Sequence, residues 1–83
     1  MKIEVFTQEN CSYCDMIKSY LKEHNIVYEE KMLTNMDNKI RLFELKQDVK
    51  TVPQVFVNGV CVGGARLALE FFDKYKENLP INV

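Results

Sequence analysis

The chain is 83 residues long, which suits a single domain over residues 1–83 with one hydrophobic core. Its 11 basic and 12 acidic side chains give a formal net charge of −1, so no overall field attracts nucleic acid or an anionic membrane. The apolar runs are too short to cross a bilayer, and 3 cysteines are too few for a secreted disulfide scaffold.

The first half of the chain predicts a strand, a helix, a second strand and a second helix. Residues 2–6 alternate polar and apolar side chains, which is typical of a strand with Ile3 and Val5 on one face. From Ser12 the apolar spacing becomes helical, and Asn25 is a plausible end of that helix. The apolar positions of this first helix are Met16, Ile17, Tyr20, Leu21 and His24.

Residues 26–33 begin with β-branched and aromatic side chains and are interpreted as a second strand. Thr34 and Asn35 then offer a cap for a second helix, expected over residues 36–47. Its apolar stripe is formed by Met36, Ile40, Phe43 and Gln47. A loop over residues 48–53 follows, because Pro53 restricts Val52 to extended backbone geometry.

The second half of the chain contains the clearest local signal. Two apolar segments, residues 54–57 and 60–62, are joined by Asn58-Gly59, which favours a type I′ hairpin because both central residues need positive φ. Gly63 and Gly64 end this hairpin. A final amphipathic helix has Ala68, Phe71, Phe72, Tyr75 and Leu79 on one face and stops at Pro80.

The order of elements is therefore β-α-β-α-β-β-α. A strand–helix–strand start implies a right-handed crossover with parallel pairing of the first two strands, and the closing hairpin adds antiparallel strands. We expect an α/β fold, with a four-stranded mixed sheet flanked by three helices. This arrangement accounts for every apolar stripe in the sequence.

The chemistry points to Cys11 and Cys14, two cysteines separated by two residues where a loop meets a helix N-terminus. The unpaired N–H groups and partial positive charge of a first helical turn favour a thiolate, and Lys18 adds a weaker positive charge. Cysteines in such positions have pKa values lowered from about 8.5 to roughly 3.5–7.5. We therefore expect Cys11 to be the attacking thiolate and Cys14, inside the helix, the resolving thiol.

A zinc site is the alternative reading of the same pair. Cys11 and Cys14 supply two ligands, and His24 and Cys61 could complete a Cys₃His set. The pair opens an amphipathic helix and no second tight ligand pair exists, so the redox reading is preferred and no metal is assigned. A Cys-x-x-Cys beside a βαβ pattern is the form of a thioredoxin-like redox motif.

Three motifs in order give the chain a family resemblance. Cys11-Ser12-Tyr13-Cys14, the segment of residues 51–57 that begins Thr51-Val52-Pro53, and Gly63-Gly64 together resemble glutaredoxin over essentially the whole chain. The resemblance implies a thioredoxin-like fold in which Pro53 is cis and faces the cysteine pair. It also implies glutathione as co-substrate.

The resemblance further implies a set of glutathione contacts. The backbone of Val52 would pair with the glutathione cysteine, Tyr13 would form one wall of the groove, and the γ-glutamyl carboxylate would meet the start of the last helix. The implied contact residues are Gln8, Tyr13, Thr51, Val52, Pro53, Gly64, Ala65 and Arg66.

Four positions depart from the usual family pattern. Ser12 replaces the common proline and either stabilises the thiolate or caps the helix. Gln8 stands where lysine often binds the glycyl carboxylate, so the contact is weaker. Arg66 replaces Asp, Ser or Thr, and it is either simply exposed or binds the γ-glutamyl carboxylate in compensation. Cys61 is an extra cysteine, either a small core residue or a regulatory thiol.

The resemblance implies an enzyme that reduces protein–glutathione mixed disulfides and protein disulfides, and we expect it to be a monomer. Two alternatives stay open. Cys-Ser-Tyr-Cys resembles glutaredoxins able to hold a glutathione-ligated 2Fe-2S cluster between two subunits. Gly64-Ala65-Arg66 resembles a segment of the redoxins that donate electrons to ribonucleotide reductase and accept them from thioredoxin reductase.

Overall fold

A computed structural model describes residues 1–75 of the chain. Four strands form one mixed sheet in the order β2-β1-β3-β4. The elements in chain order are β1 (Ile3–Thr7), α1 (Ser12–Glu23), β2 (Glu29–Met32), α2 (Met36–Leu45), β3 (Gln54–Val57), β4 (Val60–Gly63) and α3 (Ala65–Tyr75). This is the predicted order of elements, and the thioredoxin-like fold is confirmed.

The strand pairing also follows the prediction. β1 and β2 are parallel, whereas β1 pairs with β3 and β3 with β4 in antiparallel fashion. Asn58 and Gly59 both have positive φ, 52° and 80°, as a type I′ turn requires. Asn58 also ties the hairpin to the start of β1, because its Oδ1 accepts a hydrogen bond of 2.8 Å from the Lys2 backbone N–H.

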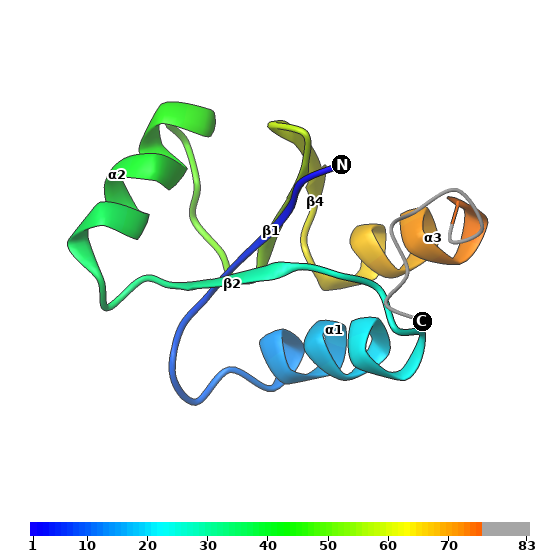
Figure 1. Ribbon diagram of the computed structural model, residues 1–83. Coiled ribbons are helices and arrows are strands. Elements are labelled where there is room, and N and C mark those ends of the chain that lie inside the picture. Colours follow the sequence, from blue (N-terminus) through cyan, green and yellow to red (C-terminus); the bar gives the residue numbers. More distant parts are fainter. Residues whose placement is uncertain (76–83) are drawn as a thin grey trace.

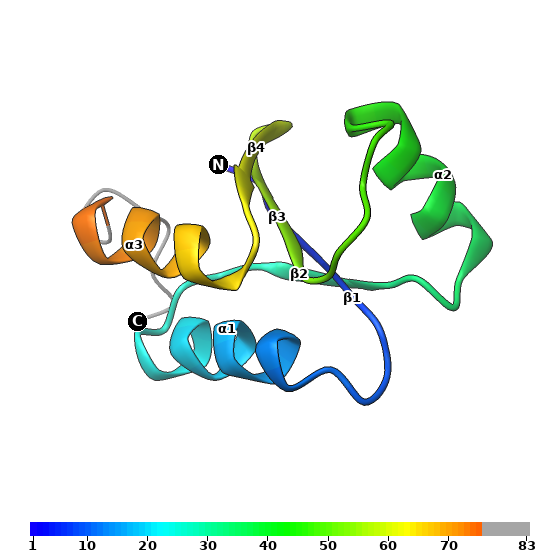
Figure 2. The ribbon, with the colours of Figure 1, turned by 180° about the vertical axis from the view of Figure 1, so that it is seen from behind.

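Helices cover both faces of the sheet. Figures 1 and 2 show α1 and α3 side by side on one face and α2 alone on the other. On the α1/α3 face the main core joins strand residues to helix residues; it contains Ile3, Val5, Ile17, Leu21, Ile26, Val55, Val57, Ala68 and Phe72. On the α2 face a smaller cluster joins Phe6, Leu42 and Phe56, in which the two phenylalanine rings meet edge to face at 5.6 Å.

β1 lies between these two cores, so all five of its residues are buried. The prediction of one apolar and one polar face was therefore incomplete: Ile3 and Val5 face α1 and α3, while Phe6 packs under α2. Glu4 is also fully buried, and its carboxylate receives two hydrogen bonds of 3.1 Å from Arg41 of α2 and lies 3.4 Å from the Lys31 ammonium. The polar residue of the alternating pattern is thus buried, and two partly exposed cations compensate its charge.

The second strand is shorter than the predicted range of residues 26–33. Ile26 is buried and forms an isolated β-bridge, while its N–H bonds to the carbonyl of Leu21 at the end of α1, and residues 27–28 lie outside any strand. Regular pairing with β1 begins at Glu29. β2 is an edge strand of the sheet, and β1 is its neighbour. Asn25, with φ of 55°, ends α1 as expected.

The second helix differs most from the prediction. It ends at Leu45 and not at residue 47, and Asn35 caps it as expected by accepting the N–H of Asp37 at 2.8 Å. The predicted stripe is not covered: Met36, Ile40 and Phe43 are 64%, 52% and 59% exposed. Leu42 is the residue of this helix that is buried.

The stripes of the other two helices are largely confirmed. In α1, Ile17 and Leu21 are buried, whereas Met16 is exposed. In α3, Ala68 and Phe72 are buried. Leu79 and Pro80, the expected end of the last helix, lie outside the described residues. Within residues 1–75, no helix is long and apolar enough to cross a membrane.

Candidate active site

Cys11 and Cys14 lie at the N-terminus of α1 and are joined as a disulfide, with Cα atoms 5.2 Å apart. Cys11 is the N-cap residue, with extended backbone (φ −118°, ψ 102°), and its Sγ accepts the N–H of Cys14 at 3.2 Å. A sulfur that caps a helix sits where backbone N–H groups and the helix dipole favour negative charge. The geometry therefore suits a thiolate at Cys11 once the disulfide is reduced.

The two sulfurs differ in exposure. Cys14 is 1% exposed and faces the core side of α1, whereas Cys11 is only half-buried. An external thiol or disulfide can therefore approach Cys11 more readily than Cys14. The difference in exposure favours Cys11 as the sulfur that an external substrate meets, and the division into an attacking and a resolving cysteine stays a prediction.

The loop before β3 forms the wall opposite Cys11. The Val52–Pro53 peptide bond is cis, as expected, and Pro53 is buried. The carbonyl oxygen of Val52 lies 3.9 Å from the Sγ of Cys11. Gly64 lies against the same loop, because a Cβ at this position would lie 3.5 Å from the carbonyl oxygen of Pro53. Residues far apart in the sequence thus meet around one sulfur.

A groove leads away from Val52. Gln8, Thr51 and Val52, three of the predicted contact residues, line a cavity of about 420 Å³ together with Leu33, Val49 and Lys50. We call this cavity the active-site groove. Sequence reasoning missed Lys50 and treated it as part of a loop, although it directly precedes Thr51 and Val52. It places a positive charge on the same groove that carries neutral Gln8.

The other predicted contact residues lie outside this groove. Tyr13 is 62% exposed in the first turn of α1, next to Cys11 in sequence. Ala65 begins α3 and is buried, whereas Arg66 is exposed in its first turn. The carbonyl of Gly64 accepts the N–H of Ala68 at 2.9 Å, so Gly64 marks the N-terminal end of α3. Two regions therefore adjoin the Val52–Pro53 segment that faces Cys11: the groove on the side of Thr51 and Val52, and the start of α3 next to Pro53.

Lys18 is paired with two carboxylates. Its ammonium forms an ion pair of 2.7 Å with Glu30 and lies 3.6 Å from Asp15. The hydrogen bond to Glu30 raises the pKa of Lys18 and, reciprocally, lowers the pKa of Glu30. These carboxylates offset the positive charge that the sequence led us to expect near Cys11.

The four residues of the alternative zinc set are dispersed. His24 lies at the C-terminal end of α1 against the Tyr20 ring, with centroids 4.3 Å apart, while the cysteine pair lies at the other end of that helix. Cys61 is half-buried on β4, packed against the cluster under α2. Among residues 1–75, no three His, Cys, Asp or Glu side chains are grouped closely enough to hold a metal ion.

Comparisons with known proteins agree with this geometry. A family model described as Glutaredoxin matches residues 3–62. Glutaredoxin 1 of Rickettsia conorii is 34% identical over 85 residues, which cover 94% of this chain and 83% of the relative. Glutaredoxin 1 of Rickettsia felis is 36% identical over 77 residues, covering 90% of this chain and 72% of the relative.

Solved structures share the fold. A buckwheat glutaredoxin–glutathione complex superposes with a TM-score of 0.71 at 26% identity, covering 89% of this chain and 70% of that chain. Reduced Escherichia coli glutaredoxin superposes with a TM-score of 0.74 and covers 93% of this chain and 99% of that chain. At 21% identity, the latter likeness concerns the fold alone.

Proposed function

Because the chain belongs to the glutaredoxin family and is a thiol–disulfide oxidoreductase, we propose that it uses glutathione to reduce protein–glutathione mixed disulfides and protein disulfides. The observation that carries this proposal is the Cys11–Cys14 disulfide, in which the half-exposed sulfur lies 3.9 Å from the Val52 carbonyl oxygen and its partner is buried. The buckwheat relative in complex with glutathione supports the choice of co-substrate.

The proposed reaction begins with Cys11 as the nucleophile. Its thiolate attacks the glutathione sulfur of a mixed disulfide, the protein thiolate leaves, and a Cys11–glutathione disulfide forms. A second glutathione thiolate then attacks the glutathione sulfur, releasing glutathione disulfide and the Cys11 thiolate. Alternatively, Cys14 attacks the Cys11 sulfur, which releases glutathione and forms the internal disulfide.

Glutathione is proposed to occupy both regions beside the Val52–Pro53 segment. Val52 would bind its cysteine by backbone hydrogen bonds, and Gln8 and Thr51 line the groove on that side. Its γ-glutamyl carboxylate would lie at the N-terminus of α3, where free N–H groups and the helix dipole favour an anion. Arg66, exposed in that first turn, adds a positive charge that offsets the neutral side chain of Gln8.

Two serine substitutions test the assignment of roles. Cys11→Ser removes the nucleophile and should abolish turnover of every disulfide substrate. Cys14→Ser should keep reduction of glutathionylated substrates, because external glutathione can resolve the intermediate, but should lose dithiol-dependent reduction of protein disulfides. Cys61→Ser, a cysteine on β4, is the matched control and should retain both activities. Substantial activity in Cys11→Ser would refute the assignment.

The electron source needs a separate assay. The protein is supplied with a disulfide substrate and either glutathione with glutathione reductase or thioredoxin reductase as the only reductant. Turnover with glutathione supports the proposal, and turnover with thioredoxin reductase alone favours the electron donor to ribonucleotide reductase. The proposal places the protein in a compartment that keeps glutathione reduced, as the cytoplasm does.

The cluster-binding alternative has its own readout. A glutathione-ligated iron–sulfur cluster would use the Cys11 thiolate as a ligand and would give a visible absorbance band in protein purified without oxygen. A band that disappears when glutathione is removed would favour a carrier or sensor over an oxidoreductase at this site. We propose the oxidoreductase because its chemistry needs only the cysteine pair that the structure places beside Val52.

A further inference from the structure

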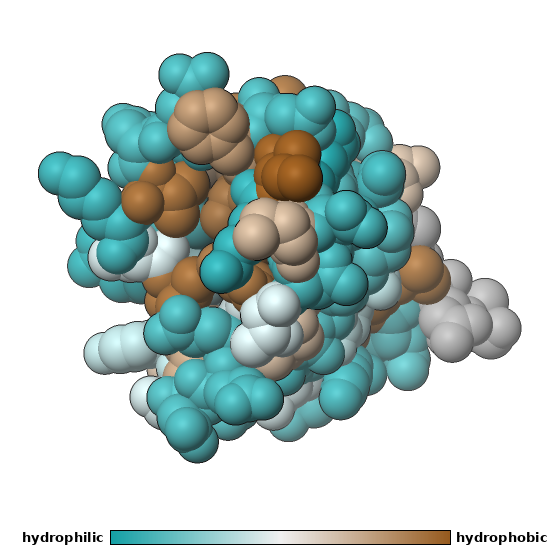
Figure 3. Space-filling model, turned by 90° about the vertical axis from the view of Figure 1, so that its left-hand side faces the viewer, coloured by the Kyte–Doolittle hydropathy of each residue, from teal (hydrophilic) through white to brown (hydrophobic). Residues whose placement is uncertain are grey.

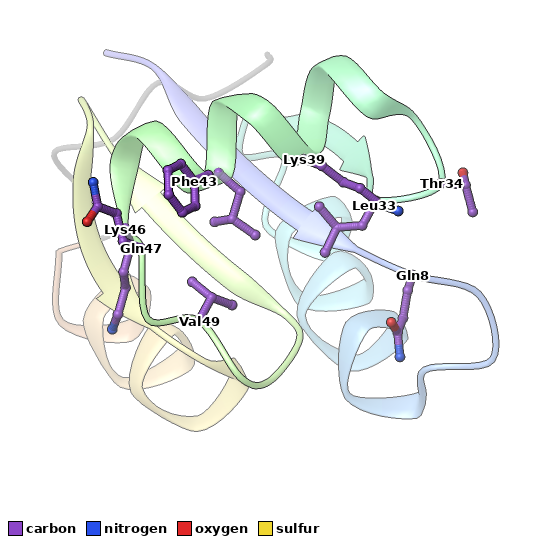
Figure 4. Close-up of a pocket in the computed structure, with 9 residues that line it drawn as sticks. Gln8, Leu33, Thr34, Lys39, Phe43, Lys46, Gln47 and Val49 are labelled. Atoms are coloured by element: carbon purple, nitrogen blue, oxygen red, sulfur yellow. The ribbon is translucent and has the colours of Figure 1, made fainter.

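A second cavity adjoins the active-site groove and lies against α2. It encloses about 460 Å³, and Figure 4 shows its lining residues. Leu33, Leu42, Phe43 and Val49 give it an apolar surface, and Lys39 and Lys46 of the helix side border it. We call this cavity the α2 pocket. In Figure 4, Leu33 and Val49 face the space beneath the helix from two different loops.

The α2 pocket and the active-site groove are continuous. Gln8, Leu33 and Val49 line both cavities. The groove then continues along Thr51 to Val52, whose carbonyl oxygen is 3.9 Å from the Cys11 sulfur. A ligand attached to Cys11 can therefore extend along one path from the sulfur to the surface of α2.

The charge along this path has one sign. Lys39 and Lys46 line the α2 pocket and Lys50 lines the groove, whereas no acidic residue among residues 1–75 lines either cavity. The whole chain has a formal net charge of −1, so this is a local concentration of positive charge. An anionic ligand is favoured there, and the complementary charge also speeds its encounter with the site.

The pocket also presents apolar surface to the solvent. Phe43, which lines it, is 59% exposed, and Met36 and Ile40 continue the same helix face. Figure 3 shows hydrophobic side chains exposed among hydrophilic ones on the side of the molecule that carries α2. Exposed aromatic side chains beside an apolar pocket and a charged rim are characteristic of protein-binding surfaces.

We propose that the α2 pocket binds the polypeptide of a disulfide substrate, through a segment that carries an acidic side chain next to a large apolar one. The apolar side chain would pack against Phe43 and Leu42, and the carboxylate would pair with Lys39 or Lys46. This proposal rests on the proposed function, because the segment reaches the pocket while its own cysteine reacts with Cys11. The proposal names the class of disulfide substrate that fits the active-site groove and the α2 pocket together.

The two cysteines of the enzyme supply the two electrons that reduce such a substrate. The Cys11 thiolate attacks one sulfur of the substrate disulfide, so that the substrate S–S bond breaks and a Cys11–substrate disulfide forms. Cys14 then attacks the Cys11 sulfur, which forms the Cys11–Cys14 bond and releases the second substrate thiolate. Two electrons pass from the enzyme to the substrate; one leaving thiolate takes the proton that Cys14 loses, and the other takes a proton from water.

The test measures how fast two synthetic peptides oxidise the pre-reduced enzyme. Both contain the same internal disulfide, but one continues with an Asp-Leu-Glu-Phe tail and the other with a Lys-Ser-Lys-Ser tail. We expect a second-order rate constant about tenfold higher for the acidic–apolar peptide. A tenfold difference corresponds to about 1.4 kcal/mol of binding free energy, which one good contact can supply. Stopped samples are alkylated, and the oxidised fraction is read by mass spectrometry.

Matched substitutions assign the difference to the pocket. Phe43→Ala and Lys39→Glu should each reduce the ratio of the two rate constants several-fold. Val60→Ala removes an exposed apolar residue of β4 that lines neither cavity, and Lys22→Glu makes the same charge change at an exposed position of α1. Both control variants should keep the wild-type ratio.

Equal rate constants for the two peptides, or a ratio that Phe43→Ala leaves unchanged, would overturn the proposal. So would a dimer that Phe43→Ala dissociates in sedimentation, because the pocket would then belong to a second copy of the chain. The assay contains no glutathione. A failure of glutathione dependence therefore appears only in the coupled assay above and is distinguishable from a failure of this proposal.

Discussion

Arg66 is the residue on which the proposed glutathione contact depends most. It lies exposed in the first turn of α3, where an anion already finds free backbone N–H groups. We predict that Arg66→Ala raises the KM for a glutathionylated substrate roughly three- to tenfold, as expected for a charge-assisted hydrogen bond at an exposed site. Steady-state assays with glutathione reductase measure it.

Arg66→Lys is the control for that substitution, since it keeps the charge and should lose less. The folded state should be unaffected, because within residues 1–75 Arg66 takes part in no ion pair. An unchanged KM in Arg66→Ala would show that the residue is only an exposed side chain of α3.

Gly63 and Gly64 are neighbours with different requirements. Gly63 has φ of 109°, and a Cβ there would lie 2.9 Å from the Leu67 side chain. We predict that Gly63→Ala lowers the free energy of unfolding by about 1–3 kcal/mol, because the substitution adds backbone strain to a steric conflict. Chemical denaturation measures the change.

Gly64→Ala is the matched control. Its backbone lies outside the positive-φ region, and the new methyl group would make an ordinary contact of 3.5 Å with the carbonyl oxygen of Pro53. It should therefore destabilise the protein less than Gly63→Ala. If Gly64→Ala destabilised the protein more than Gly63→Ala, the close approach to Pro53, and not the backbone angle, would be the reason why glycine is required in this pair.

At the scale of elements, α2 is attached to the sheet by an ion pair between partly exposed Arg41 and the buried carboxylate of Glu4. The Glu4 carboxylate on β1 is fully buried, and the hydrogen bonds from Arg41 are the main cause of its lowered pKa. We predict that Arg41→Ala lowers the free energy of unfolding at neutral pH, because it leaves a buried carboxylate with less compensation. Lys39→Ala, an exposed position on the same helix, should cost little.

The cost of Arg41→Ala should depend on pH. The folded-state pKa of Glu4 lies below its unfolded value of about 4.3, so its stabilising effect is complete above that value and is lost as the pH falls through the folded pKa. The difference in unfolding free energy between wild type and Arg41→Ala should therefore narrow below about pH 4. A difference that stays constant down to the acid limit would contradict a role for the ionised carboxylate.

Helix α2 also shows what could not be predicted from the sequence. The Asn58-Gly59 turn, the Asn35 cap and the Cys11 position were predictable because each depends on local chemistry. The exposed face of α2 was not, because periodicity identifies an apolar stripe without saying whether another element covers it. Arg41 was missed for a similar reason: its partner, Glu4, is 37 residues away in the chain.

The candidate site shows the same division. The cysteine pair and the Thr51-Val52-Pro53 segment were recognised from their residues, whereas their approach to within 3.9 Å depends on the antiparallel pairing of β1 with β3. The α2 pocket needs side chains from two loops and a helix, Leu33, Phe43 and Val49 among them. No local pattern specifies such a meeting.

At the scale of the whole molecule, the two faces of the sheet are unequally stabilised. α1 and α3 each bury three residues, whereas α2 buries Leu42. We predict that the amides of α2 exchange through a local opening that costs less free energy than the global unfolding that exposes β1. Native-state hydrogen exchange in low denaturant measures both.

Phe72→Ala provides the comparison for that experiment. It removes a fully buried ring from the larger core and should lower the free energy of global unfolding by about 3–5 kcal/mol, leaving the local opening of α2 nearly unchanged. Identical exchange free energies for α2 and β1 in the wild-type protein would refute the prediction of a separate opening.

The separation of Cys11 from Val52 along the chain has one more consequence. All of α1, β2 and α2 lies between them, although the Val52 carbonyl oxygen lies 3.9 Å from the sulfur. A protease that cuts the backbone within residues 34–50 leaves the nucleophile on one fragment and the facing wall on the other. The nicked enzyme should remain competent while the pairing of β1 with β3 and the core shared by α1 and α3 hold the fragments together. Sheet pairing, and not the intervening peptide, is what keeps the halves of this site in register.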